Sequence, residues 1–289
     1  MPMAADTQPA TPATTQTQIV DRLSRLPYWL ILILLGGVIL FYSITTDELY
    51  SVIFGRLAQG VAISLFVAIA SYVVAIVIGL IVALGRVSKN PIAYNLATLY
   101  VNVIRGVPIL VQIFYVAFVL SPAFISMVNG LGDGLAGLLG PENFLAKATT
   151  QDISMLARVM IALAIAYGGF EAETFRAGIE SIGRGQMEAA RSLGMSYFQA
   201  MRYIILPQAF RRVLPPLGND FVSMVKDSSL VSVLGVRDIT QEARLYAAAS
   251  FRYPETYNTL AFLYLAITFT LSLGVKLLEN RLSKGGKGS

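Results

Sequence analysis

The chain has 289 residues, 55% hydrophobic and only 13% charged, and its mean hydropathy of +0.65 excludes an ordinary water-soluble domain and predicts a membrane protein. It contains no cysteine and no histidine, which excludes disulfides and thiolate metal sites, and we expect neither a metal nor a cofactor. The formal net charge of +5 does not indicate nucleic-acid binding, because the basic residues are dispersed between apolar runs.

The first 27 residues predict a disordered cytoplasmic tail. Residues 1–18 are rich in Thr, Pro, Gln and Ala and have too few bulky apolar side chains to bury a core. The apolar run at 28–44 resembles a signal peptide, but the following "YSITTDELYS" has no small-x-small cleavage site. We therefore expect a retained transmembrane helix, which with its loop forms an extra N-terminal segment over residues 28–56.

Five further runs are long enough for a bilayer-crossing helix, which takes roughly 20 residues. These runs are residues 61–84, 96–120, 153–170, 213–235 and 257–279. The run at 213–235 contains Asp220, Lys226 and Asp227, so its hydropathy is low, but its length and its position between polar stretches favour a span. The sequence thus predicts an all-α membrane protein, a bundle of six transmembrane helices.

The distribution of basic residues predicts the orientation of these spans. With the N-terminus inside, most Lys and Arg residues outside the spans lie on the cytoplasmic side, as the positive-inside rule requires. We expect cytoplasmic N- and C-termini. The segment at 121–152 is then an outside loop, and its G-x-G-x-x-G match at Gly132, Gly134 and Gly137 lacks the strand that a dinucleotide site needs before it. We expect a flexible loop there.

Residues 181–212 are too polar to span a membrane, and their pattern predicts two short cytoplasmic helices joined by a turn. The first helix contains Gln186 to Leu193 and ends where Gly194 can adopt the left-handed conformation. Ser196 and Gln199 form a capping box for the second helix. We expect the second helix to stop near Leu206, because Pro207 disfavours helical geometry in the residue before it.

The spacing in this segment is that of a known signature, EAA-x3-G-x9-I-x-LP. The residues that match it are Glu188, Ala189, Ala190, Gly194, Ile204, Leu206 and Pro207. It resembles the coupling loop of the permease subunits of ABC importers. That resemblance implies a loop that docks on a separate ATP-binding subunit, and this chain has no G-x-x-x-x-G-K-[ST] motif of its own.

Other segments resemble the polar amino acid uptake permeases of the same class. These segments are "VIRGVPILVQIFY" from Val103, "EAETFRAGIESIGRGQMEAARSLG" from Glu171 and "LPQAFRRVLPPLGNDFVSMVKDSSL" from Leu206. The resemblance covers a five-span core at 57–282, followed by a cytoplasmic tail at 283–289. The departures are Val107 and Ser228, where the family has Thr, and Glu171 beside Glu173, where it usually has one acid.

The resemblance implies a transporter subunit rather than an enzyme. It implies a plasma (bacterial inner) membrane location, a second permease subunit, identical or not, and an extracytoplasmic amino-acid-binding protein that delivers a polar amino acid. An ion-driven secondary amino acid transporter is the alternative, but we see no inverted repeats. A membrane enzyme without His would need a spaced acidic pair within a span, and none is apparent.

A charge near the bilayer centre costs at least ~2.5 kcal/mol, so such residues are candidates for the substrate pathway. Lys226 and Asp227 project about 100° apart on a helix and offer both signs to a zwitterion. Alternatively, Lys226 snorkels toward the interface, or it pairs with Glu173 or Asp227. Ser228 and Ser229 either bond substrate or bond back to their own helix.

Two further charged positions are candidates for the pathway. Glu173 either contacts substrate or forms an i,i+3 ion pair with Arg176 at the interface. For Glu171 we expect the interfacial ion-pair role. Arg105 precedes Gly106 and Pro108, where a proline interrupts the helix, and it either contacts substrate or positions the span.

Overall fold

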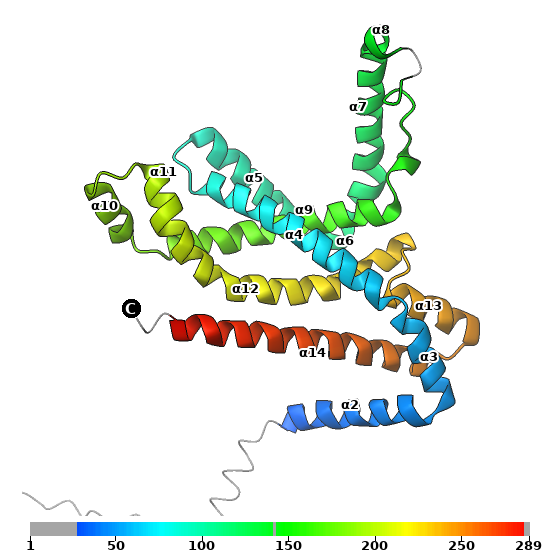
Figure 1. Cartoon of the computed structure of the whole chain (residues 1–289). Helices are drawn as coiled ribbons and strands as arrows, with labels where there is room; N and C mark the ends of the chain where they lie inside the picture. Colours follow the sequence, from blue (N-terminus) through cyan, green and yellow to red (C-terminus); the bar gives the residue numbers. More distant parts are fainter. Residues whose placement is uncertain (1–27, 141–142, 286–289) are drawn as a thin grey trace, which may run out of the picture. The chain divides into compact units, whose positions relative to one another are not determined.

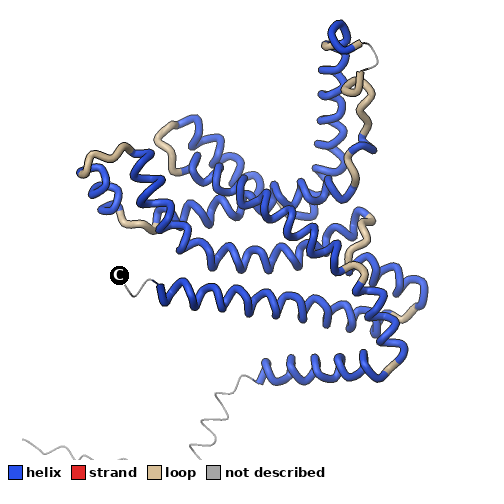
Figure 2. Tube along the Cα trace, in the orientation of Figure 1, coloured by secondary structure: helices blue, strands red, loops and turns tan. Residues whose placement is uncertain are grey.

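A computed structural model describes residues 28–140 and 143–285 of the chain, and the tail expected at 1–27 lies outside the described residues. All elements of secondary structure in these ranges are helices, joined by loops and turns (Figures 1 and 2). The chain divides between Ser51 and Val52 into two compact units, which are described separately. The domain boundaries expected from the sequence stay predictions.

The first unit contains α2 (Tyr28–Thr46), and α3 (Glu48–Ala58) begins at its end. The 19 residues of α2 span about 28 Å and expose apolar side chains along the helix, as expected of a helix in lipid. The hydroxyls of Ser43 and Thr46 donate to the carbonyls of Ile39 and Tyr42, four residues back. These bonds satisfy polar groups that would otherwise be costly in an apolar environment.

The second unit is built on α4 (Val61–Arg86) and α9 (Met155–Glu180), which pack along each other. Against α9 also lie α5 (Pro91–Gly106) and α12 (Leu206–Asp227), and α12 carries α14 (Tyr253–Gly285) on another side (Figure 1). Alanine and glycine residues of α9 let its neighbours approach closely, and α9 has many buried residues. The remaining elements are α6 (Ile109–Tyr115), η1 (Val116–Leu120), α7 (Ser121–Gly134), α8 (Ala136–Leu139), η2 (Thr150–Asp152), α10 (Arg184–Ser192), α11 (Tyr197–Ala200), η3 (Met201–Ile205), η4 (Ser228–Leu234) and α13 (Ile239–Ser250).

Within the described residues, four helical stretches are long and apolar enough to cross a membrane: Glu48–Arg86, which includes the short turn between α3 and α4, Ile109–Gly134, Met155–Glu180 and Tyr253–Arg281. A shorter apolar helix covers Ile31–Thr46. The helix α12 is absent from this set because Arg211, Arg212, Asp220, Lys226 and Asp227 lower its hydropathy. The all-α membrane fold is confirmed, whereas the number of six spans stays a prediction.

The third predicted span, 96–120, is not one continuous helix, and the interruption predicted at Pro108 is present. The span breaks at Val107 and Pro108, which have extended ψ angles of 133° and 140°. The second part then continues through η1 and α7 to Gly134, so the flexible loop expected around Gly132 is wrong. Apolar residues at helical spacing, Ile125, Val128 and Leu131, favour a helix here despite the glycines. Asn143, in the segment that follows, donates to the Gly132 carbonyl at 2.9 Å.

The expected helix end near Leu206 is wrong as well. The chain passes from α11 through the π-helical turn η3 directly into α12, with Pro207 in the first turn of α12. A π turn contains one extra residue, and proline is tolerated in a first turn because its missing N–H has no partner to lose there. The helical hairpin, which consists of α10, α11 and the turn between them, is therefore continuous with α12 rather than separated from it.

The start of α13 makes stability depend on pH. Asp238 is fully buried and accepts from the Gln241 backbone N–H at 2.8 Å, and burial raises the pKa of its carboxyl to about 6. A raised pKa means that the folded state holds the proton more tightly than the unfolded state. The resulting stability is present below about pH 4, the usual value for Asp, and is lost as pH rises through about 6.

We expect Asp238→Asn to remove this dependence, because Asn caps a helix as well as Asp but does not ionise. The wild type should lose roughly 1–3 kcal/mol more than the variant between pH 4.5 and 7.5. Thermal unfolding of both detergent-solubilised proteins at the two pH values measures the difference. Parallel pH profiles would contradict the role of Asp238.

Candidate functional site

The first helix of the hairpin ends as its sequence predicts. Gly194 has a φ of 83°, in the left-handed region that favours glycine. Its N–H donates to the Arg191 carbonyl at 3.0 Å, and the Met195 N–H donates to the Ala190 carbonyl at 3.2 Å. This pair of bonds is a Schellman motif, which satisfies the free carbonyls at the end of α10 and turns the chain sharply.

The second helix begins with the predicted capping box. The Gln199 N–H donates to Ser196 Oγ at 3.2 Å, and the Ser196 N–H donates to Gln199 Oε1 at 2.8 Å. Because both ends of the turn are fixed by local hydrogen bonds, the angle between α10 and α11 is set by the hairpin's own sequence. The hairpin is thus a preformed element.

The signature residues divide between the two sides of this hairpin. Glu188, Ala189, Gly194 and Pro207 are exposed, whereas Ala190 is buried. Ile204 and Leu206 are half-buried and pack on a cluster formed by Ile179, Ile182, Met201, Ile205 and Ala209, which Leu84 and Val87 also join. This cluster anchors the hairpin to the ends of α4 and α9.

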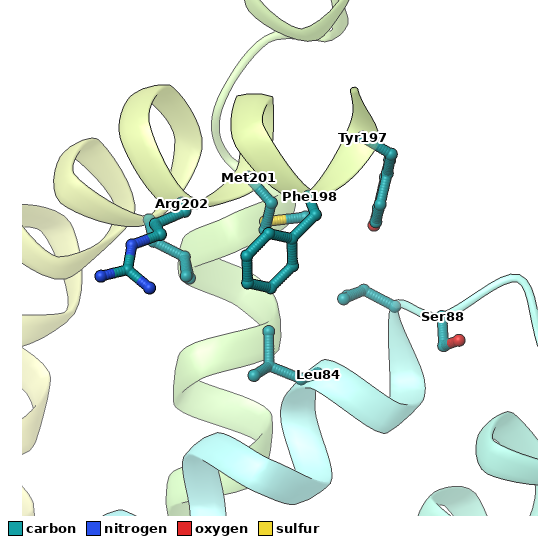
Figure 3. A pocket seen from close by; sticks show the side chains of 8 residues that line it. Leu84, Ser88, Tyr197, Phe198, Met201 and Arg202 are labelled. Carbon is teal, nitrogen blue, oxygen red and sulfur yellow. The ribbon is translucent and has the colours of Figure 1, made fainter. Parts of the chain in front are cut away.

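Large apolar side chains of the hairpin remain uncovered. Leu193 is 83% exposed, Phe198 69% and Tyr203 62%. Between α11 and the end of α4 lies a hollow of about 360 Å³. Figure 3 shows the Phe198 ring pointing toward Leu84 across this hollow, with Tyr197 and Met201 beside it. Exposed apolar surface of this kind marks an interaction surface.

Glu173 on α9 joins three helices through ion pairs. It accepts from Arg86 at the end of α4 and from Arg176 on its own helix, and its Oε2 lies 4.0 Å from Arg105 Nη1 of α5. The Arg105 guanidinium also lies 5.6 Å from the centre of the Phe170 ring. The predicted pair with Arg176 is therefore present, within a larger network that includes Arg105.

Glu171 contradicts the ion-pair role expected for it. Its side chain is fully buried, and neither carboxyl oxygen has a hydrogen-bond partner among the described residues. It projects toward α4, where a Cβ on Gly79 would come within 2.5 Å of the Glu171 Cβ. Glu171 and Glu173 are two residues apart on α9 and therefore project about 200° apart, so only one of them meets the arginines.

The Lys226 to Ser229 segment lies where α12 changes into the 3-10 helix η4. Asp227 accepts a hydrogen bond from the Tyr167 hydroxyl at 2.8 Å. Lys226 is exposed, and within the described residues no ion pair joins it to Glu173 or Asp227. Ser228 is buried and its hydroxyl donates back to the Val225 carbonyl at 2.8 Å, whereas Ser229 is half-buried.

Sequence reasoning missed a second polar contact between α9 and α12. The Thr174 hydroxyl donates to the Asp220 carboxylate at 3.5 Å. Thr174 follows Tyr167 by seven residues, and Asp220 precedes Asp227 by seven. A seven-residue spacing returns to nearly the same helix face, so this pattern could have identified the pair. The structure brings together Arg105 with Glu173 and, separately, Asp227 with Tyr167.

No group of three or more acidic, Cys or His side chains that could hold a metal occurs in the described ranges 28–140 and 143–285. The hairpin therefore offers a surface for another protein, and the Glu173 network and the Lys226 to Ser229 segment offer charged groups for a ligand.

Residues 75–284 match the family described as "Binding-protein-dependent transport system inner membrane component". The chain belongs to this family.

The family is one of multi-pass membrane transport components, and similar proteins agree with the assignment. The "Probable amino-acid permease protein YxeN" of Bacillus subtilis (strain 168) is 37% identical over 231 residues, which cover 80% of this chain and 93% of that protein. The "Glutamine transport system permease protein GlnP" of Escherichia coli (strain K12) is 33% identical over 226 residues, which cover 78% and 92%. The resemblance to ABC importer permeases is confirmed.

Solved structures agree with this fold. A chain of an amino acid ABC transporter crystallised with histidines matches with a TM-score of 0.63 and 35% identity, covering 78% of this inner membrane component and 94% of that chain. A chain of the MetNI methionine ABC transporter matches with a TM-score of 0.59 and 18% identity, covering 78% and 96%. At that identity the second likeness concerns the fold alone.

Proposed function

We propose that this inner membrane component is the permease subunit of an ATP-driven importer of polar amino acids. The observation that carries the proposal is the preformed hairpin, whose signature spacing coincides with uncovered apolar side chains at Leu193, Phe198 and Tyr203. A partner protein that covers this surface gains the free energy of apolar burial. Amino acid permeases among the relatives support the substrate class.

The partner at the hairpin is a separate ATP-binding subunit in this proposal. Closure of two such subunits on ATP pulls on the hairpin, and the cluster around Ile204 and Leu206 carries the movement into α4 and α9. An extracytoplasmic binding protein delivers the amino acid, and a second permease subunit completes the pathway. Both termini face the cytoplasm, which the basic residues around the hairpin support.

The substrate pathway includes Lys226, Asp227, Ser228 and Ser229, with Glu173 and Arg105 as a second charged position. The exposed Lys226 ammonium and the Asp227 carboxylate have the signs that complement the carboxylate and ammonium groups of an amino acid. Asp227 remains half-buried beside Tyr167, so its carboxylate is held by one hydrogen bond and keeps acceptor capacity for a ligand.

An ion-driven transporter is the competing proposal, and the energy source separates the two. In cells that produce the complete transporter, the proton and sodium gradients are collapsed with ionophores while cellular ATP is kept constant. Uptake of a labelled polar amino acid should continue at close to its initial rate. A halt in uptake at unchanged ATP would favour the ion-driven transporter.

A further inference from the structure

The break between α5 and α6 leaves backbone groups without their usual helical partners. Val107 and Pro108 have extended ψ angles, and Pro108 has no N–H to donate. The last carbonyls of α5 therefore cannot bond to the following turn, and in an apolar environment each unpaired carbonyl is costly. Something else must satisfy them at this point.

Gln112 supplies the missing donors. Its side-chain Nε2 donates to the Ile104 carbonyl at 2.7 Å and to the Val107 carbonyl at 2.8 Å. The side chain belongs to α6 and the Ile104 carbonyl to α5, so one amide group joins the two helices across the break. Gln112 is only 7% exposed, which shields both bonds from competition with water.

Each helix at the break is fixed to a different part of the unit. On α5, Ile104 packs so closely on α9 that a Cβ at Gly169 would lie 2.7 Å from Ile104 Cγ2, and the next residue is Arg105. On α6, Ile113 is fully buried in a cluster with Leu163 and Val231, and Val231 belongs to η4. The break thus joins α5, which is held at the Arg105–Glu173 contact, to α6, which packs against the segment that follows Ser229.

We propose that Gln112 is a positioning residue for transport. Its two hydrogen bonds set the angle between α5 and α6 and thereby hold Arg105 at Glu173 while α6 stays in the core. The two helices then move as one body when the transporter changes state. The inference rests on the proposed function, but the angle at the break can be measured independently of transport.

The matched variants are Gln112→Met, which keeps the side-chain length but removes both donors, and Ser121→Ala. The Ser121 hydroxyl is also buried and donates to the Val116 carbonyl at 2.7 Å in the continuous helix after the break. Ser121→Ala therefore removes a buried hydrogen bond of the same kind without touching the break. Gln112→Asn keeps the amide donors on a shorter side chain. It replaces Gln112→Met as the test variant if Gln112→Met accumulates poorly in the membrane.

The chain has no cysteine, so two introduced cysteines label only the chosen positions. Spin labels at Leu99→Cys on α5 and Phe118→Cys after α6, both exposed, report the angle as a distance distribution in the assembled transporter. Gln112→Met should broaden or shift this distribution, Gln112→Asn should do so less, and Ser121→Ala should leave it unchanged.

Uptake at equal membrane abundance is measured in the same variants without labels. Gln112→Met should reduce it about tenfold or more, the factor that two ordinary hydrogen bonds carry, and Ser121→Ala should stay within about twofold. An unchanged distribution in Gln112→Met, or a changed one with normal uptake, overturns the inference. Absence of ATP-driven uptake by the wild type would instead contradict the proposed function, and the distance distribution would still test Gln112.

Discussion

Gly194→Trp is expected to abolish ATP-driven uptake while the chain still inserts and folds. A Cβ at Gly194 would meet no atom within 4 Å, so the indole extends outward beside the uncovered Leu193 and does not disturb the core. An ATP-binding subunit would then meet a bulky side chain at the centre of its docking surface. Loss of such a contact is worth on the order of 2–4 kcal/mol, so uptake should fall by a factor of about 30 to 700.

Two smaller substitutions separate side-chain bulk from backbone strain. Gly194→Ala adds little volume but places a Cβ in the left-handed region, at a cost of about 1–2 kcal/mol to the turn. Gly194→Asn adopts that region more readily. Uptake, ATP hydrolysis and membrane abundance are measured for all three variants. Normal uptake by Gly194→Trp, or a loss fully explained by low abundance, would contradict the coupling role of the hairpin.

Glu173→Met is expected to destabilise the protein, whereas Glu171→Met is neutral or stabilising. Removal of the Glu173 carboxylate leaves Arg86, Arg105 and Arg176 without their shared partner at a site where its side chain is 28% exposed. We expect a loss of roughly 1–3 kcal/mol, below the value for a fully buried pair because the site is partly open. Uptake should fall together with stability, because Arg105 loses the carboxylate that holds it in place.

Glu171→Met removes a buried carboxyl group that has no hydrogen-bond partner among the described residues. Met has nearly the shape of Glu, so an apolar replacement recovers burial without breaking a bond, and the Tyr72 hydroxyl keeps its bond to the Leu217 carbonyl at 2.5 Å. Glu180→Gln is the surface control, because Glu180 is 54% exposed and, in the part of the chain that the structure describes, pairs only with Arg176. Thermal unfolding ranks the three variants, and equal losses for Glu171→Met and Glu173→Met would refute the assignment.

Local features of the candidate site could be predicted from the sequence. The left-handed Gly194 and the capping box of Ser196 and Gln199 depend on residues within one turn of each other, and rules of capping describe such turns. The interruption at Pro108 was visible for the same reason, because proline lacks a donor whatever surrounds it. The all-helical fold class followed from the apolar runs.

Contacts between distant residues could not be predicted in this way. The i,i+3 rule indicated Arg176 as the partner of Glu173, but Arg86 reaches the same carboxylate from a position 87 residues earlier. Glu171 was misassigned because sequence spacing does not reveal which face of α9 packs against α4. The helix across Pro207 was missed because a single π turn relieves the steric conflict, and no local pattern marks where such a turn forms.

Uptake into reconstituted vesicles tests the coupling proposal most directly. Vesicles hold the purified permease, with its partner permease if there are two, and the binding protein with labelled amino acid outside. ATP is enclosed with or without the ATP-binding subunit. Accumulation should occur only with the ATP-binding subunit and ATP together, and should vanish with Gly194→Trp. Accumulation against a gradient in vesicles that lack this subunit would contradict the account.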